Sequence, residues 1–356
     1  MPRPIIATIN QNALKHNLSI ARNLAPSSHI WAVVKANAYG HGIKNVWKSL
    51  IKADGFALLN LDKAIFLRDH GWDKPILLLE GFFNSDDIKI IHHYSLTTAI
   101  HSHWQIQALK KAKLLSPVNV YLKINCGMNR LGFQPNEIKK IWHQLRSCKN
   151  IGEVTLMSHF PEAENPQGVT EPMKRITQAA IGLKCPHSLA NSAATLWHPK
   201  THFDWIRPGI MLYGASPSGD WKHVSRSGLK PVMTLTSKVI AIQEIPQGAS
   251  VGYNRNYCAP YKQRIGIVAC GYADGYPRHA PSGTPIKVNN EMTQTIGSVA
   301  MDMLAVDLTN HPNTGLGSTV ELWGENIKID DLAVIARTVG YEIMCSLSQR
   351  VPVKLY

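Results

Sequence analysis

VNVYLKINCGMNRLGFQPNEIKKIWHQLRSCKNIGEVTLM, residues 118–157, contains the repeating unit that decides the fold. An apolar run, VNVYLKI (118–124), comes before NEIKKIWHQLRSC (136–148), in which apolar residues recur at three- and four-residue spacing. That spacing is typical of a helix with one apolar face. A second apolar run, EVTLM (153–157), follows. The stretch therefore predicts a strand, a helix and a strand, the unit that links parallel strands of one sheet.

The same alternation recurs from about residue 30 to residue 215, with six further apolar runs. These are WAVV (31–34), FALL (56–59), PILLL (75–79), LTTAI (96–100), CPHSLA (185–190) and FDWIR (203–207). Eight strands that alternate with helices predict a parallel sheet closed into a (β/α)8 barrel, an α/β fold. An open, doubly wound sheet is the alternative, but no GxGxxG sequence follows the first strand. The preceding segment, residues 10–25, predicts one more amphipathic helix with Asn10 as its cap.

After about residue 228 the pattern changes. Alternating segments such as MTLTSKVIAI (233–242) and STVELWG (318–324), separated by Gly, Pro and Asn turns, predict mostly antiparallel β structure. One late helix is expected over DDLAVIARTVG (330–340). The opening PIIATIN (4–10) also alternates and is expected to pair with this part of the chain. We therefore predict a barrel domain at 9–228 and a β-rich C-terminal domain at 229–356, which residues 1–8 join.

Composition excludes several classes of protein. The chain has 356 residues, 44% apolar and 17% charged, as in globular proteins with a large core. Its net charge is +14, but the Lys and Arg residues are dispersed and form no nucleic-acid-binding motif, so we expect no nucleic-acid partner. No apolar run approaches the roughly 18 residues that span a bilayer, and no signal peptide is evident, so we expect no membrane contact and a cytoplasmic location. The six cysteines lie far apart without a CxxC pair, which indicates reduced thiols, no metal site and no disulfide framework.

One lysine stands at an unusual place. In WAVVKANAYGHG (31–42), Lys35 directly follows a predicted buried strand. In a barrel this position is the carboxyl end of the strand, where active sites are built. A lysine whose stem packs on the rim while its ammonium group reaches water is the structural alternative. The chemistry that favours a functional role is condensation of the amine with a carbonyl, either of a substrate or of pyridoxal phosphate.

These residues carry a family resemblance. VVKANAYGHG (33–42) resembles the pyridoxal-phosphate lysine motif of alanine racemases. Further motifs follow in the family's order: YLKINCGMNRLGF (121–133), MSHF (157–160), ANSAAT (190–195), RPGIMLYG (207–214), VGYNRNY (251–257), GYADGYPR (271–278), GSVAMDM (297–303) and RVPV (350–353). The resemblance covers nearly the entire chain and is greatest to the racemases of Gram-negative bacteria, including the catabolic type. It implies a (β/α)8 barrel followed by a β domain, and interconversion of L- and D-alanine for peptidoglycan precursors or for alanine catabolism.

The resemblance also implies a mechanism with two bases acting on an aldimine of pyridoxal phosphate. Lys35 corresponds to the lysine that holds the cofactor and serves the D-alanine face, and Tyr253 of the partner subunit corresponds to the base on the L-alanine face. The two active sites are then shared across a head-to-tail homodimer. His159 corresponds to the histidine that helps to fix the tyrosine. Cations favour a neutral lysine and a tyrosinate, and the candidate cations are Arg207 and Arg130.

Other residues correspond to those that bind the cofactor. Arg207 corresponds to the arginine that faces the pyridine nitrogen, where a guanidinium that keeps its proton leaves that nitrogen unprotonated. The cofactor phosphate is expected to be held by Tyr39, Ser192 and the backbone N–H groups of Gly209 and Ile210.

The substrate-binding residues follow from the same motifs. Arg130 corresponds to the arginine that contacts the substrate carboxylate, and Lys123 to a lysine that is often carbamylated in the family and orients that arginine. Tyr272, Met301 and Asp302 correspond to residues that wall the substrate site from the second subunit.

The sequence departs from the family pattern at a few positions. Gln349 stands where many relatives have the tyrosine that precedes RVP, and Ser298 where many have arginine. Asn125 and Cys126 replace a frequent Asp-Thr pair. A broad-specificity amino-acid racemase dependent on pyridoxal phosphate is the alternative function. A decarboxylase on the same plan, or a cofactor carrier made of the barrel alone, fits the sequence less well.

Overall fold

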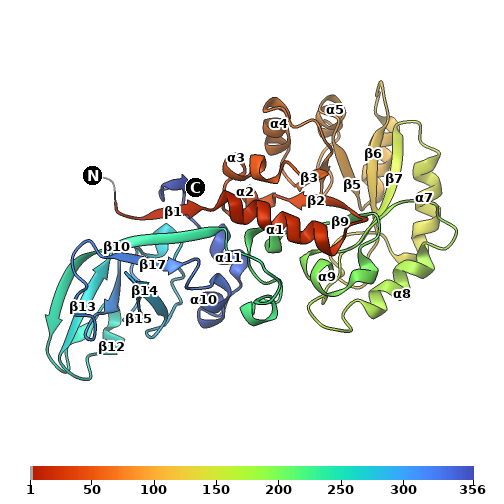
Figure 1. The fold of residues 1–356 in the computed structure, drawn as a ribbon. Coiled ribbons are helices and arrows are strands. Elements are labelled where there is room, and N and C mark those ends of the chain that lie inside the picture. Colours follow the sequence, from red (N-terminus) through yellow and green to blue (C-terminus); the bar gives the residue numbers. More distant parts are fainter. Residues whose placement is uncertain (1–2) are drawn as a thin grey trace. The chain divides into compact units, whose positions relative to one another are not determined.

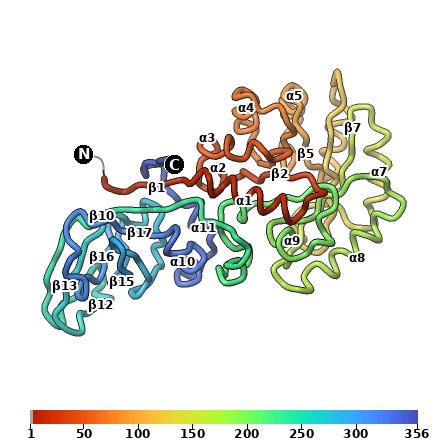
Figure 2. The backbone as a smooth tube through the Cα atoms, in the orientation of Figure 1, coloured from red at the N-terminus to blue at the C-terminus, as the bar shows by residue number. Residues whose placement is uncertain are grey.

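The computed structural model describes residues 3–356, which form two compact units. The barrel unit consists of residues 18–38 and 50–212, and the β unit of residues 3–17, 39–49 and 213–356. Figures 1 and 2 show the chain as a ribbon and as a tube.

The barrel unit contains the predicted closed barrel of eight parallel strands, in sequence order from β2 to β9. The strands are β2 (His29–Val33), β3 (Gly55–Leu58), β4 (Ile76–Leu78), β5 (Thr97–Ile100), β6 (Val118–Lys123), β7 (Ile151–Met157), β8 (His187–Ser188) and β9 (Trp205–Ile206). Each strand falls on one of the eight predicted apolar runs, to within two residues at its start. All residues of β3, β4 and β5 are buried, as expected for parallel strands covered on both faces.

Helices alternate with these strands, and Figure 1 shows them around the outside of the barrel unit. They are α4 (Leu61–Asp69), α5 (Asp87–His93), α6 (His103–Lys111), α7 (Ile138–Arg146), α8 (Thr170–Ala179) and α9 (Ser192–Trp197), with short 3-10 turns η2 (Pro135–Glu137) and η3 (Pro199–Thr201). In α7 the buried residues are Ile138, Ile141 and Leu145, which is the stripe that the spacing predicts.

The helix predicted near the N-terminus is α1 (Gln11–Leu24). Asn10 caps it, because its Oδ1 accepts a hydrogen bond from the Ala13 N–H at 2.8 Å. Between β2 and β3 the chain forms α2 (Lys35–Tyr39), α3 (Ile43–Val46) and η1 (Trp47–Leu50).

The β unit is built on an eight-stranded sheet with the order β13-β16-β15-β14-β17-β10-β1-β18. Its strands are β1 (Ile6–Ile9), β10 (Met233–Ile245), β13 (Gln263–Val268), β14 (Pro285–Val288), β15 (Glu291–Ile296), β16 (Leu304–Asp307), β17 (Thr319–Trp323) and β18 (Val353–Leu355). A separate pair is formed by β11 (Ser250–Val251) and β12 (Tyr257–Cys258). The predicted mostly β C-terminal part is thus confirmed. β1 pairs antiparallel with β10 and parallel with β18, so the opening segment adds to this sheet.

The late helix differs from the prediction in its extent. Helix α10 (Ile329–Ile335) ends before Arg337, and a second helix, α11 (Gly340–Cys345), follows. Arg337 has φ of 54°, a left-handed conformation that cannot continue a right-handed helix. The sequence holds no glycine or proline at this point to signal the break.

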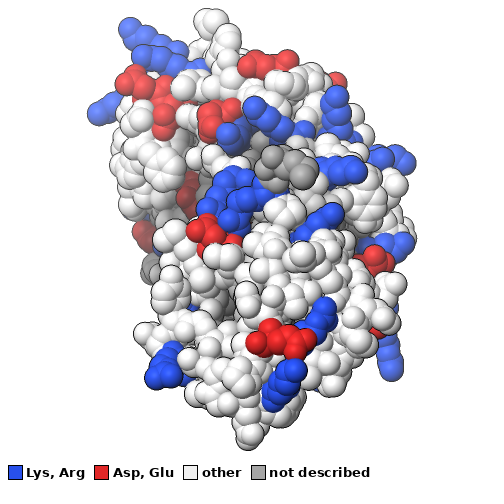
Figure 3. Space-filling model, turned by 90° about the vertical axis from the view of Figure 1, so that its left-hand side faces the viewer, with Lys and Arg blue, Asp and Glu red and all other residues white. Residues whose placement is uncertain are grey.

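The structure also shows how the charged side chains and the cysteines are distributed. Lys and Arg side chains are spread over the face in Figure 3, with Asp and Glu between them. All six cysteines are free; Cys126, Cys148 and Cys270 are buried. Within residues 3–356, no helix has the length and apolar character needed to cross a bilayer.

Candidate active site

Lys35 follows β2 at the carboxyl end of the first barrel strand. The backbone after it is left-handed, with φ between 50° and 57° at four successive residues: Ala36, Asn37, Ala38 and Tyr39. A left-handed conformation costs a residue other than glycine roughly 1–2 kcal/mol. Strain of this kind is kept where the surrounding structure imposes it, often at functional sites. No residue type in this stretch predicts the turn, because none of the four residues is glycine.

Positive side chains gather at the same edge of the barrel. Lys123 ends β6, and Arg207 comes directly after β9. The pKa of Lys123 is lowered to about 8: burial is the largest cause, the positive charges of Arg207, Arg130 and Lys35 act in the same direction, and Glu80 partly offsets them. These four positive side chains belong to separate sequence motifs, and the fold brings them close enough to affect one another electrostatically inside the barrel unit.

Arg207 is buried and held by hydrogen bonds from its two Nη atoms. Nη1 donates to the carbonyl oxygen and, at 2.8 Å, to the hydroxyl of Ser188, and Nη2 donates to the carbonyl oxygens of Ser158 and Leu189. No hydrogen bond or ion pair to a carboxylate is found for it in the described part of the chain. Burial lowers its pKa to about 10, so the guanidinium remains charged at neutral pH.

His159 lies two residues after β7, beside the same cations. Burial lowers its pKa well below the ordinary value of 6.5, and Arg207 and Arg130 lower it further, so the ring is neutral at pH 7. Lys123, Arg130 and His159 line one small cavity. The barrel unit thus brings together three of the residues expected to act near the cofactor and substrate.

Asn125 supports the loop that carries Arg130, a role that the sequence interpretation missed. Its Oδ1 accepts the N–H groups of Gly127 at 3.1 Å and Asn129 at 3.0 Å, and its Nδ2 donates to the Asn129 Oδ1 at 2.9 Å. Gly132 closes the loop, because a Cβ there would lie 2.8 Å from the Asn125 backbone nitrogen. The side-chain amide of Asn125 therefore organises the loop through its own hydrogen bonds.

The residues of the barrel unit that are expected to bind phosphate lie at the N-terminal ends of two short helical segments. Ser192 begins α9, and Ile210 begins the 3-10 turn η4 (Ile210–Tyr213). The Gly209 N–H donates to the Ser192 Oγ at 2.8 Å, which brings the two beginnings together. The first N–H groups of such turns have no partner within the turn and can bind an anion.

The remaining expected site residues lie in the β unit. Tyr39 is buried and stacks on Tyr213 with ring centroids 4.7 Å apart, and burial raises its pKa. Tyr253 begins the turn η6 (Tyr253–Arg255) and is 68% exposed. The same turn has left-handed backbone at Asn254 and Arg255, with φ of 61° and 53°.

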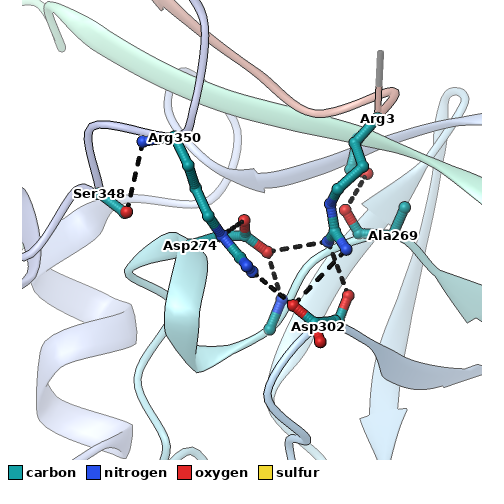
Figure 4. A network of polar contacts seen from close by, with 8 residues as sticks. Arg3, Ala269, Asp274, Asp302, Ser348 and Arg350 are labelled. Atoms are coloured by element: carbon teal, nitrogen blue, oxygen red, sulfur yellow. Dashed lines mark hydrogen bonds and ion pairs between the residues drawn. The ribbon is translucent and has the colours of Figure 1, made fainter. Parts of the chain in front are cut away.

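Tyr272, Met301 and Asp302 come together within the β unit. Tyr272 begins the turn η7 (Tyr272–Asp274), and its N–H donates to the Ala300 carbonyl oxygen at 3.0 Å. Asp302 pairs with Arg350, whose Nη2 lies 2.7 Å from the Asp302 Oδ1 (Figure 4). The sequence interpretation did not single out Arg350.

We expect Lys123→Met to stabilise the protein at pH 7 by up to about 3 kcal/mol, since one pKa unit corresponds to about 1.4 kcal/mol. The folded-state pKa is about 8 against 10.5 ordinarily, so the unfolded chain binds this proton more tightly. The destabilising contribution of the buried Lys123 ammonium group therefore decreases as the pH rises through this interval, and the stability difference between the variant and the wild type decreases with it. Denaturant unfolding of both proteins between pH 7 and pH 10.5 measures the difference.

Carbamylation of Lys123 would give a different result. A carbamylated Lys123 takes up no proton, so the difference between the two proteins would then lack this pH dependence. The variant would also be less stable than the wild type in bicarbonate buffer. Intact-mass analysis of the wild type distinguishes a carbamate from a free amine.

Comparison with known families decides where the chain belongs. The family model of the alanine racemase N-terminal domain matches residues 9–217, and that of the C-terminal domain matches residues 232–355. The chain belongs to the alanine racemase family. It is therefore an enzyme of the racemase class, and the family resemblance and the fold class are confirmed.

Individual alanine racemases are similar over their whole length. One from Erwinia tasmaniensis is 64% identical over 354 residues, which are 99% of each chain. A catabolic alanine racemase of Klebsiella aerogenes is 61% identical over 353 residues, again 99% of each chain. The structure of a biosynthetic alanine racemase from Pseudomonas aeruginosa has a TM-score of 0.96 and 41% identity, with 99% of both chains covered. The roles of individual residues, the domain boundary at 228 and the cytoplasmic location stay predictions.

Proposed function

We propose that this racemase interconverts L- and D-alanine with pyridoxal phosphate as cofactor, and that Lys35 and the partner subunit's Tyr253 are its two bases. The observation that carries the proposal is the position of Lys35. It stands at the end of a barrel strand, before a strained left-handed turn, and its charge acts on the buried Lys123 together with those of Arg207 and Arg130. A primary amine among fixed cations suits carbonyl chemistry, because cations favour its neutral, nucleophilic form.

The donor groups of the barrel unit fit this cofactor. Pyridoxal phosphate, when bound, supplies the electron sink that makes the Cα proton of an amino acid removable. Arg207 uses only its Nη atoms in the hydrogen bonds that the described residues accept, which leaves its Nε–H to face a ring nitrogen. Ser192 and the N–H groups of Gly209 and Ile210, with Tyr39, would hold the phosphate. Lys35 would hold the cofactor covalently.

Proton transfer then needs one base on each face of the Cα atom. Lys35 would take or return the proton on the D-alanine face, and the partner subunit's Tyr253 on the L-alanine face. His159, neutral because of its burial and the adjacent cations, can accept a hydrogen bond from a tyrosine hydroxyl and so orient it. Both bases must exchange protons in turn, so both are required in each direction.

The substrate carboxylate would be bound by Arg130, with Tyr272, Met301 and Asp302 of the partner subunit as the wall of the site. Tyr253 is 68% exposed and Met301 54% exposed in the single chain. Exposed aromatic and methionine side chains of this kind are enriched at protein–protein interfaces, which supports a homodimer with shared active sites. A broad-specificity amino-acid racemase remains the second candidate, since the wall residues also decide which side chains fit.

A chiral assay on purified protein tests the proposal. We expect conversion of L-alanine to D-alanine and the reverse, with activity lost after removal of the cofactor and restored by added pyridoxal phosphate. Conversion of serine, lysine or arginine at a rate comparable to that of alanine would favour the broad-specificity enzyme. Alanine turnover that does not depend on the cofactor would contradict the proposal.

A further inference from the structure

Four charged side chains of the β unit, none of which takes part in the proposed proton transfers, form a closed network of ion pairs (Figure 4). They are Arg3, Asp274, Asp302 and Arg350, and we call this network the arginine clamp. Arg350 donates from Nε to the Asp274 Oδ1 and from Nη2 to the Asp302 Oδ1, both at 2.7 Å. Arg3 donates from Nη2 to the Asp274 Oδ2 at 3.1 Å and to the Asp302 carbonyl oxygen at 2.8 Å. Two guanidinium groups balance two carboxylates, so the clamp carries no net charge.

Asp274 connects the clamp to the turn that carries Tyr272. Its side chain is fully buried, and its Oδ2 also accepts the Gly271 N–H at 2.9 Å. Its carbonyl oxygen accepts the Ser348 N–H at 3.1 Å, which ties the turn to the segment that carries Arg350. A buried carboxylate with charged and backbone donors on both oxygens is held in a fixed position.

The turn also lies against the segment that carries Met301 and Asp302. The Ala273 N–H donates to the Met301 carbonyl oxygen at 3.0 Å. A Cβ at Gly271 would lie 2.3 Å from the carbonyl oxygens of Ala300 and Met301, so only glycine permits this close approach. Backbone contacts thus join the two segments on one side, and Arg350 joins them through Asp274 and Asp302.

We infer that Arg350 is a positioning residue for the wall of the substrate site, which it serves by holding Tyr272, Met301 and Asp302 at one spacing. The inference rests on the proposed function of these three residues. The geometry of the guanidinium carries it: two of its nitrogens reach two carboxylates on separate segments. A lysine ammonium is a single point charge and lacks this rigid fork. Arg350 and Asp302 are 39% and 40% exposed, so solvent weakens their ion pair and the fixed spacing is the larger effect.

Two variants separate spacing from charge. Arg350→Gln removes the charge and the fork, whereas Arg350→Lys keeps the charge and removes only the fork. We expect both to raise the KM for alanine about tenfold, the effect of losing roughly one charge-assisted hydrogen bond, while kcat changes less than about threefold. A wall that binds substrate and transition state equally well affects KM rather than kcat.

Hydrogen exchange gives a readout that does not depend on turnover. In both variants the amides of residues 271–275 and 300–303 should exchange faster than in the wild type, because the clamp no longer holds the two segments. Arg264→Gln is the matched control. The guanidinium of Arg264 donates to the carbonyl oxygens of His311 at 3.0 Å and Thr314 at 2.6 Å in the same unit, so its loss should change neither KM nor the exchange of these peptides.

The outcomes are distinct. Wild-type KM and exchange in Arg350→Lys would show that charge alone matters and would overturn the inference, as would an equal rise of KM in Arg264→Gln. A fall of kcat with unchanged KM would also overturn it. If the wild-type enzyme does not racemise alanine, the proposed function fails, and the exchange data alone then report whether Arg350 holds the two segments.

Discussion

Lys35→Ala is expected to lower racemisation of alanine at least about 10³-fold and to abolish stable binding of the cofactor. A single acid–base group commonly contributes about 10² to 10⁴-fold, and Lys35 is proposed to supply both the covalent attachment and one base. The measurements are the visible absorbance of the bound cofactor and the chiral assay on each enantiomer.

The controls for this prediction are straightforward. Lys110→Ala removes an exposed lysine of α6 in the same unit and should leave both absorbance and activity unchanged. Circular dichroism of Lys35→Ala should match the wild type, since the amine is not needed for the barrel core. An unchanged rate of racemisation in Lys35→Ala would contradict the proposed role of this residue.

Tyr253→Phe is expected to keep the cofactor and to lower racemisation about 10² to 10⁴-fold, the range that one general base contributes. The phenol is lost without a change of shape, so exchange of the Cα proton of L-alanine with solvent should stop while exchange from D-alanine continues. Incorporation of deuterium from the solvent into each enantiomer measures the two faces separately. Tyr261→Phe, which changes another exposed tyrosine of the β unit, is the matched control.

A mixing experiment tests whether the two bases come from different subunits. A dimer of one Lys35→Ala chain and one Tyr253→Phe chain has one intact site if each site is shared, because one chain supplies Lys35 and the other supplies Tyr253. Co-expression of the two inactive chains should then restore activity. Absence of any recovery in a verified mixed dimer would place both bases in the same subunit.

The barrel could be predicted because its strands are buried on both faces and therefore appear as continuous apolar runs. The runs at 56–59, 75–79 and 96–100 correspond to strands in which every residue is buried. The two shortest strands of the barrel, β8 and β9, have only two residues each, and their apolar runs extend beyond the paired residues. The pattern of apolar residues indicates which residues are buried. Which of them form β pairs depends on the neighbouring strand, which the run itself does not reveal.

The features that the sequence did not reveal depend on tertiary structure. The left-handed turn after Lys35 contains alanine and asparagine rather than glycine, so local propensity argues against it. Arg3 and Asp274, which pair in the clamp, are 271 positions apart along the chain. No spacing rule relates residues at that distance, and only the assembled sheet brings them together. Arg350 was visible as part of RVPV, but its two carboxylate partners were not.

Strand β1 has a consequence for the order of events during synthesis. Its antiparallel partner β10 begins at residue 233, and its parallel partner β18 spans residues 353–355. A ribosome that adds about 5–20 residues per second delivers the barrel sequence before either partner. Strand β1 must therefore wait with its edges uncovered, and the sheet is completed only after the residues of β18 have been synthesised. Loss of β18 would leave that edge open for pairing with another molecule.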